Sequence, residues 1–234
     1  FLPDIKHILS KLPDKRQNLL FSATIPDEIQ SLIDKIMNNP VKIEIEKSKA
    51  ADSVKQEVYF VPNYQKLELI EHILQTYTWS SCIVFSSTKR GTEVIGKDLK
   101  KIGMEVATIH GDRDQDERNK ALHAFKTGKV KIIVATDVLA RGIDIDDVSL
   151  ILNYDVPKSP EDYIHRIGRT GRYDKSGLAI TFVNRNDGRL FKAIEEKVPD
   201  IEHKQGPDHI KKKGSNSSKS TGRSGRSKPS QDKK

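Results

Sequence analysis

Residues 131–153 read KIIVATDVLARGIDIDDVSLILN, two apolar runs separated by a segment rich in charge. Runs in which neighbouring positions are all apolar are typical of strands covered on both faces, as in a parallel sheet. Similar short runs recur along the chain and alternate with amphipathic stretches at helical spacing. This alternation predicts an α/β fold: a doubly wound parallel sheet with helices on both faces and right-handed crossovers.

The elements follow from apolar runs, β-branched residues and nearby turn residues. We expect strands at NLLFSAT (18–24), VKIEI (41–45), QEVYFV (56–61), CIVFSS (82–87), EVATIHG (105–111), KIIVATD (131–137), SLILNYD (149–155) and LAITFVN (178–184). We expect helices at Asp27–Met37, Gln65–Thr76, Lys89–Ile102, Gln115–Lys126, Pro160–Gly168 and Asp187–Lys197. Ligands of such sheets bind beyond the carboxyl ends of the strands, and we expect every polar motif to lie there.

The formal net charge of +8 is concentrated at one end of the chain. Residues 204–234 contain ten Lys/Arg and two Asp/Glu, a net of +8, and the other 203 residues contain 31 of each sign. A stretch so poor in apolar residues is predicted to be disordered. It suits binding to a polyanion through counterion release, without reading of any sequence. The alternative is a tail that only keeps chains apart in solution.

Several classes of protein are excluded by composition. No apolar run approaches the roughly 18 residues that suggest a membrane helix, and the start FLPDIKHILS does not have the order of a signal peptide. We therefore expect a soluble, cytoplasmic protein with no membrane partner, and a fragment, because the chain does not begin with Met. Cys82 lies in an apolar run and is predicted to be a buried thiol. The histidines lack paired zinc-site spacing, so we expect no metal site.

Residues 162–172, DYIHRIGRTGR, concentrate basic side chains around two glycines. Ser159 and Pro160 predict a helix start just upstream, and the glycines let the backbone turn at the helix end. Three guanidinium groups are therefore expected to form one cluster: Arg166, Arg169 and Arg172. Such a cluster favours either the phosphates of a ligand or an internal network, for instance with Asp144 or Asp162. The stretch alone leaves both open.

A second polar stretch is HGDRDQDERNK, residues 110–120. Asp114 as N-cap and Glu117 three residues later predict a capping box. Gln115 and Arg118 then lie on the first helical turn, where free N–H groups and the helix dipole favour an anion. The first turn could bind a backbone phosphate, and the alternative is a solvated helix face.

A third polar stretch is VATDVLARGIDI, residues 134–145, which follows a predicted buried strand. Gly142 permits a positive φ in this stretch. A hydroxyl, an arginine and two carboxylates occur within nine positions: Thr136, Asp137, Arg141 and Asp144. Such groups can contact a sugar-phosphate chain on one side and a nucleotide ribose on the other.

Together these stretches resemble one family. SAT (22–24), IVFSST (83–88), HGD (110–112), QDER (115–118), TDVLARGID (136–144) and HRIGRTGR (165–172) occur in the order and approximate spacing of the DEAD-box ATP-dependent RNA helicases. The resemblance runs from residue 1 to about residue 198. His165 favours the DEAD-box branch, because other superfamily-two helicases usually carry Gln there. The basic tail resembles that of the bacterial RhlE-like group.

The resemblance implies two RecA-like domains that close around ATP and single-stranded RNA. It implies a catalytic group in which Arg169 and Arg172 are arginine fingers, Arg166 supports them, and His165 links them to Ser22 and Thr24 of the SAT segment. For ATP it implies Asp144 near the ribose, with Gly142, Arg169 and Arg172. For RNA, held mainly through its backbone, it implies Ser86, Thr88, Gly111, Gln115, Arg118, Thr136 and Arg141.

The sequence departs from the family in what it lacks. It has no Gly-x-x-x-x-Gly-Lys-[Ser/Thr] loop and no Asp-Glu-Ala-Asp motif. The resemblance therefore implies that the main ligands of ATP and Mg²⁺ lie on a missing N-terminal domain, and that this chain alone does not hydrolyse ATP. The implied layout is 1–46 as a remnant of the first RecA-like domain, 47–55 as linker, 56–200 as the C-terminal RecA-like domain and 201–234 as disordered basic tail.

The sequence alone leaves two other functions open. One is a stand-alone RNA-binding or regulatory module without catalysis. The other is a DNA-directed helicase of the same superfamily, which contacts to the RNA 2′-hydroxyl would distinguish.

Overall fold

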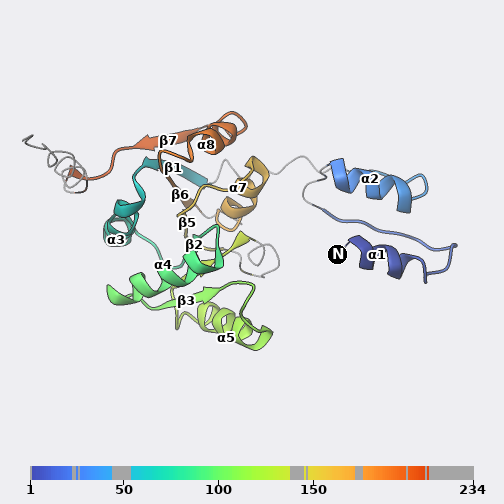
Figure 1. Cartoon of the computed structure of the whole chain (residues 1–234), viewed down its shortest axis with the longest axis horizontal. Helices are drawn as coiled ribbons and strands as arrows, with labels where there is room; N and C mark the ends of the chain where they lie inside the picture. Colours follow the sequence, from blue (N-terminus) through green and yellow to red (C-terminus); the bar gives the residue numbers. More distant parts are fainter. Residues whose placement is uncertain are drawn as a thin grey trace, which may run out of the picture. The chain divides into compact units, whose positions relative to one another are not determined.

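The chain divides into two compact units, Phe1–Glu46 and Lys47–Lys234, whose elements are labelled in Figure 1. This computed structural model describes residues 2–22, 25, 27–43, 54–137, 145, 147–171, 176–198, 200–208 and 210. The larger unit carries most of the predicted site residues, and it determines how they are arranged.

The larger unit is built on a seven-stranded sheet of order β3-β4-β2-β5-β6-β1-β7. All of its strand pairs are parallel, as the consecutive apolar runs predicted. The strands are β1 (Val54–Phe60), β2 (Cys82–Phe85), β3 (Val106–Ile109), β4 (Ile132–Ala135), β5 (Leu150–Asn153), β6 (Gly177–Val183) and β7 (Ile201–Lys204).

Helices cover both faces of this sheet. The helical elements are η1 (Asn63–Gln65), α3 (Lys66–Thr76), α4 (Lys89–Lys101), α5 (Gln115–Lys126), α7 (Pro160–Ile167) and α8 (Gly188–Glu195). The buried side chains of α3 and α4 share one hydrophobic cluster, and those of α5, α7 and α8 share the other. Their separation into two clusters confirms the doubly wound α/β fold.

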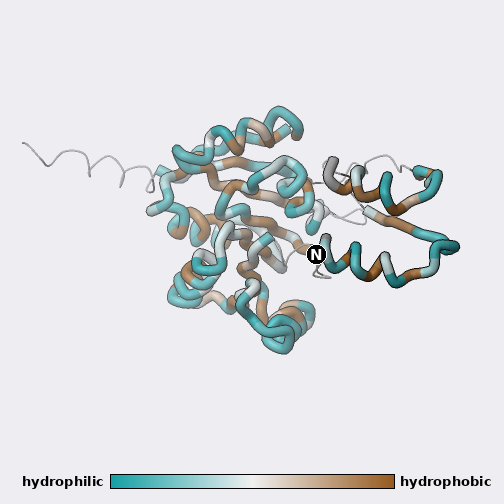
Figure 2. Tube along the Cα trace, turned by 45° about the vertical axis from the view of Figure 1, so that its right-hand side comes forward, coloured by the Kyte–Doolittle hydropathy of each residue, from teal (hydrophilic) through white to brown (hydrophobic). Residues whose placement is uncertain are grey.

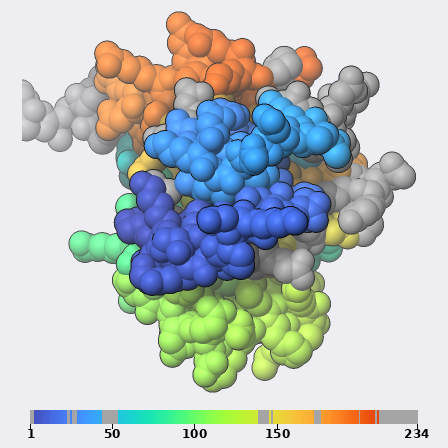
Figure 3. All heavy atoms as spheres, turned by 90° about the vertical axis from the view of Figure 1, so that its right-hand side faces the viewer, coloured from blue at the N-terminus to red at the C-terminus, as the bar shows by residue number. Residues whose placement is uncertain are grey.

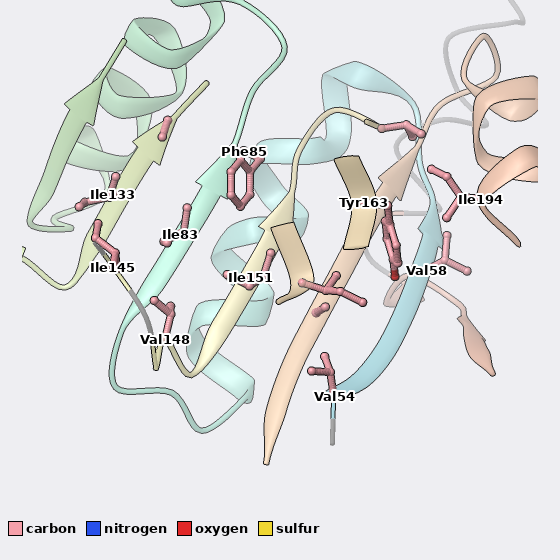
Figure 4. Packing of buried hydrophobic residues seen from close by; sticks show 14 of the residues in the cluster. Val54, Val58, Ile83, Phe85, Ile133, Ile145, Val148, Ile151, Tyr163 and Ile194 are labelled. Carbon is pink, nitrogen blue, oxygen red and sulfur yellow. The ribbon is translucent and has the colours of Figure 1, made fainter. Parts of the chain in front are cut away.

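The sheet is the centre of the core. Strands β2, β4 and β5 are buried at every position, which explains why each is apolar throughout. Figure 2 shows hydrophobic colour along the strands inside this unit and hydrophilic colour on the helices around them. Figure 4 shows the cluster on one face, where Phe85, Ile151 and Tyr163 project into the layer between sheet and helices. Cys82 is buried as predicted, and burial raises the pKa of its thiol.

Strand β7 was not predicted. It pairs in parallel with β1, with Gln56 opposite Ile201 and Tyr59 opposite Lys204. The predicted boundary of the domain at residue 200, with a disordered tail from residue 201, is therefore wrong at this end. The sequence IEHK hides the strand because it is mostly polar, as suits the charged edge of a sheet. Residues 211–234 of the predicted tail lie outside the described residues.

The smaller unit contains helices α1 (Leu2–Leu9) and α2 (Asp27–Ile36). Strands were predicted at 18–24 and 41–45, but the described parts, 18–22 and 41–43, form no strand. No neighbouring segment in the described part of the chain pairs with them, and Leu19, Phe21 and Val41 are 71%, 90% and 87% exposed. The apolar pattern was recognised correctly, but a strand also needs a hydrogen-bonded neighbour.

Candidate functional site

Loops from four neighbouring strands meet at one edge of the sheet. Strands β3, β4, β2 and β5 are consecutive in the sheet, so the segments that follow them emerge side by side. Backbone hydrogen bonds continue past the strand ends, from Ser86 N to Ala135 O (3.0 Å), from Thr136 N to Ile109 O (3.4 Å) and from Asp155 N to Phe85 O (3.3 Å). The predicted RNA-contact residues in the described part of the chain all lie in these loops or at the adjoining end of α5.

Arg166 of α7 joins these loops from the inside. Its Nε and Nη2 donate to the two carboxylate oxygens of Asp137 at 2.5 and 2.8 Å. Its Nη1 donates to Asn153 Oδ1 at 3.1 Å and to the carbonyl oxygen of Asp155 at 2.8 Å. The guanidinium also lies 4.9 Å from the ring centre of Phe85. Only 2% of Arg166 is exposed, so this arginine is a structural member of the core.

The sequence left open whether the arginines of residues 162–172 bind a ligand's phosphates or form an internal network. For Arg166 the internal network is correct, and it includes the carboxylate of Asp137; Asp144 lies outside the described residues. The predicted cluster of three arginines is therefore wrong for Arg166, because its guanidinium is turned into the protein. Asp137 had been noted in the sequence, but spacing alone could not show that its bidentate partner lies 29 residues away.

Helix α7 starts and ends as predicted. The Ser159 side chain accepts a hydrogen bond from Asp162 N at 3.1 Å, and Gly171 adopts a φ of 68° just beyond the helix. Arg169 follows the helix and is partly exposed, and its carbonyl oxygen accepts a hydrogen bond from Val148 N at 3.0 Å.

Val148 precedes β5, so Arg169 lies towards the amino end of that strand. Figure 4 shows Val148 at the end of the sheet opposite Phe85. The expectation that every polar motif lies beyond the carboxyl ends of the strands is therefore wrong for Arg169. The predicted RNA residues and the predicted ATP arginine are separated along the sheet, and α7 connects the two regions.

The start of α5 has the geometry that the sequence predicted. Glu117 N donates to Asp114 Oδ1 at 2.7 Å, and both hydrogen bonds of the capping box are present. Gln115 is exposed on the first turn, and Arg118 Nη2 donates to the carbonyl oxygen of Gly111 at 3.2 Å. Figure 3 shows atoms of α5 (yellow-green) at the surface. Three of the predicted RNA residues thus lie together at a capped helix start.

Glu93 of α4 holds the loop before α5, although no sequence motif pointed to this residue. Its Oε1 accepts hydrogen bonds from Thr108 Oγ1 at 2.8 Å and Arg113 Nη2 at 2.9 Å, and it lies 2.7 Å from His110 Nε2. Burial acts to raise the pKa of Glu93, but these hydrogen bonds outweigh burial and hold that pKa at about 2. The carboxylate stays ionised at neutral pH and fixes the conformation of residues 110–113.

The loop after β2 is held by hydrogen bonds of its own hydroxyl groups. Ser86 is buried, and its Oγ donates to Asp155 Oδ2 at 3.0 Å. Thr88 Oγ1 accepts from Gly91 N at 2.9 Å and caps α4. A Cβ atom at Gly91 would lie 2.5 Å from Ser86 Oγ, so the close approach requires glycine. The surface that this loop offers to a ligand is formed by Ser87 and Thr88, which are exposed.

The remaining predicted residues are placed as follows. Thr136 is buried directly after the end of β4. His165 is partly buried on α7, and Ser22 is exposed in the smaller unit. Residues with predicted roles that lie outside the described part of the chain are Thr24, Arg141, Gly142, Asp144 and Arg172.

The described residues supply only part of what a site for ATP and a metal ion would need. Of the predicted ATP contacts only Arg169 is described, and it can supply a cation but no cradle of N–H groups for phosphates. Within the described ranges no group of three or more His, Cys, Asp or Glu side chains could hold a metal ion. The same ranges contain no helix long and apolar enough to cross a membrane.

Comparison with known proteins agrees with this geometry. Residues 65–174 match the helicase conserved C-terminal domain family. The ATP-dependent RNA helicase CshA of Listeria monocytogenes is 41% identical over 198 residues, which cover 84% of this chain and 38% of CshA. The chain thus spans less than half the length of this curated relative.

Two solved structures are also similar. The C-terminal domain of the DEAD-box protein Dbp5 is 37% identical, with a TM-score of 0.62 over 68% of this chain and 93% of that domain. Saccharomyces cerevisiae Dbp5 bound to RNA and ADP BeF3 is 34% identical, with a TM-score of 0.75 over 89% of this chain and 57% of Dbp5. The chain therefore belongs to the DEAD-box protein family, and its larger unit is the C-terminal RecA-like helicase domain of that family.

Proposed function

We propose that this chain is the C-terminal part of an ATP-dependent RNA helicase, which couples ATP binding and hydrolysis to RNA binding and local duplex unwinding. The observation that carries the proposal is the arrangement in one domain of two separated groups of residues. The loop cluster at the carboxyl ends of β2, β3 and β4 suits RNA, and Arg169 lies just beyond the end of α7, towards the amino end of β5. The names of its relatives support the same activity.

The RNA-binding part of the proposal rests on backbone recognition. Exposed Gln115 and partly exposed Arg118 lie on the first turn of α5, where N–H groups and the helix dipole attract a phosphate. The exposed residues Ser87 and Thr88 lie at the start of α4 in the neighbouring loop. Contacts to phosphates and 2′-hydroxyls hold RNA without reading its bases. The edge therefore suits single-stranded RNA of any sequence.

The ATP part of the proposal assigns transition-state stabilisation to Arg169 and Arg172. ATP with Mg²⁺ supplies the phosphoryl group, and we propose that its main ligands lie on a RecA-like domain outside this sequence, because the sequence contains neither the phosphate loop nor the Asp-Glu-Ala-Asp motif. The two arginines would offer cations to the charge that develops during transfer. Arg166 would keep α7 in place through Asp137.

The basic tail is proposed as a non-specific RNA anchor. Residues 211–234 contain nine Lys/Arg and one Asp, a net of +8, so correcting the domain boundary leaves the charge argument unchanged. Deleting residues 211–234 should remove most of the RNA affinity of the isolated chain and flatten its salt dependence. Each neutralised phosphate contributes about −0.7 to the slope of log K against log salt on single strands. Fluorescence anisotropy with a labelled single-stranded RNA between low and physiological salt measures both.

A shuffled tail of the same composition is the matched control, and it should restore both the affinity and the slope, since counterion release does not depend on sequence. If the truncated chain keeps the affinity and slope of the intact one, the tail only aids solubility. If the intact chain binds no RNA at low salt, the proposed RNA binding itself fails.

A further inference from the structure

One carboxylate, that of Asp155, connects three elements of the proposed site. Its Oδ2 accepts hydrogen bonds from Ser86 Oγ at 3.0 Å and from Ser87 N at 2.8 Å. Its Oδ1 lies 3.6 Å from Lys66 Nζ of α3. The main-chain carbonyl oxygen of Asp155 accepts a hydrogen bond from Arg166 Nη1 of α7 at 2.8 Å. We call these five residues the Asp155 junction. Asp155 thereby contacts the loop after β2, helix α3 and helix α7.

Lys66 is the least expected member of the junction. The lysine is fully buried, although lysine is almost never buried without a partner. Its Nζ donates to the carbonyl oxygen of Tyr154 at 2.6 Å and lies 4.9 Å from the centre of the Tyr154 ring. Burial lowers the pKa of Lys66, and the charge of Asp155 opposes that shift. The buried amine therefore fixes residues 154 and 155 through both the main chain and the carboxylate.

The two halves of Asp155 serve different regions. The side chain holds Ser86, which is buried beside the surface proposed for RNA, and Ser87, which is part of that surface. The main-chain carbonyl oxygen holds Arg166 in the last turn of α7, and Arg169 follows two residues beyond the end of that helix. A change in the loop that moves Asp155 must therefore disturb the hydrogen bonds that position α7. Such a contiguous chain of contacts between two sites is the kind of connection that carries energetic coupling.

We propose that Asp155, held by Lys66, is a positioning residue that couples RNA contact at the loop after β2 to the placement of the arginine-bearing helix α7. The inference deepens the proposed function and rests on it, because it concerns how RNA binding stimulates ATP turnover. Neither residue contacts RNA or ATP in this account. Both act through the groups that they hold.

The test uses Asp155→Asn and Lys66→Met in the reassembled protein, meaning this chain placed after a RecA-like domain that carries the phosphate loop and the Asp-Glu-Ala-Asp motif. Asparagine keeps the shape of Asp155 but removes its charge, and methionine fills the space of Lys66 without an amine. The RNA concentration for half-maximal ATPase stimulation should rise about 10- to 100-fold, as expected from weakening one or two hydrogen bonds to a charged group. The ratio of stimulated to basal turnover should fall in both variants.

Glu57→Gln is the matched control. Glu57 is also fully buried; it accepts a hydrogen bond from Tyr77 Oη at 2.7 Å and forms an ion pair with Lys55 Nζ at 2.8 Å. The hydrogen bonds and ion pairs described for it reach neither the loop after β2 nor α7. This variant should lower the melting temperature while leaving the RNA stimulation curve unchanged. Comparison with Asp155→Asn at a temperature where both variants are folded separates coupling from stability.

A double-mutant cycle adds a second readout. Because Ser86 acts through Asp155, Ser86→Ala combined with Asp155→Asn should shift RNA stimulation no further than Asp155→Asn alone. If Asp155→Asn behaves like Glu57→Gln, or if the two effects simply add, the coupling role is overturned. If the unmutated reassembled protein shows no RNA-stimulated turnover, the proposed function fails, and that outcome is distinct from failure of the junction.

Discussion

Replacing Arg169 or Arg172 with alanine in the reassembled protein should lower kcat for RNA-stimulated ATP hydrolysis about 10³- to 10⁵-fold, the range found for arginine fingers. RNA affinity should stay within a few-fold, because a group that acts mainly in the transition state need not affect ground-state binding. Steady-state ATPase assays and RNA titrations with a non-hydrolysable nucleotide measure the two quantities. Arg169 is suited to this role because it is partly exposed beyond the end of α7.

Arg189→Ala is the control for loss of a positive charge. Arg189 is exposed on α8, outside both groups of predicted site residues, so its removal should leave kcat and RNA affinity unchanged. Equal losses of turnover and RNA binding in Arg169→Ala would contradict the catalytic role and indicate a structural one.

Replacing Arg166 with methionine should instead destabilise the isolated chain by about 3–5 kcal/mol, since removing the buried member of an ion pair leaves the partly buried carboxylate of Asp137 uncompensated. For a domain of this size that corresponds to a fall in melting temperature of roughly 6–20 °C. Arg166 is 2% exposed and donates to Asp137 through two nitrogens, whereas Arg169 is partly exposed. Thermal unfolding followed by circular dichroism should therefore show a large loss for Arg166→Met and a small one for Arg169→Ala.

A double-mutant cycle can distinguish loss of the Arg166–Asp137 ion pair from a general loss of packing. If the ion pair carries the effect, Arg166→Met and Asp137→Asn together should destabilise the chain by clearly less than the sum of the single changes, because each single change leaves the charge of the other residue uncompensated. Additive losses, or an Arg166→Met variant as stable as the unmutated chain, would contradict the structural role assigned to Arg166.

The parts of the fold that could be predicted are those fixed by local chemistry. The sequence CIVF is apolar at every position because β2 is buried on both faces. The caps at Ser159 and Asp114 form as predicted because their partners lie three residues away. Strand β7 could not be predicted, since its edge position removes the apolar pattern.

The residues of the candidate site also divide into those that local sequence predicts and those that it does not. Motif residues such as Gln115 and Arg118 were recognised because their roles follow from a helix start within the same motif. Lys66 and Asp155 were not, because their partnership joins positions 89 residues apart that each look unremarkable in sequence. The inward direction of Arg166 was left open for the same reason: spacing shows which residues share a helix but not which carboxylate a long side chain reaches.

The most direct test of the account is ATP turnover with and without single-stranded RNA, measured for the isolated chain and for the reassembled protein. The chain alone should give no turnover, because its sequence contains no phosphate loop and no Asp-Glu-Ala-Asp motif. The reassembled protein should hydrolyse ATP with strong stimulation by RNA and little by DNA of the same sequence, since discrimination rests on the 2′-hydroxyl. Steady turnover by the pure isolated chain, or equal stimulation of the reassembled protein by DNA, would contradict the account.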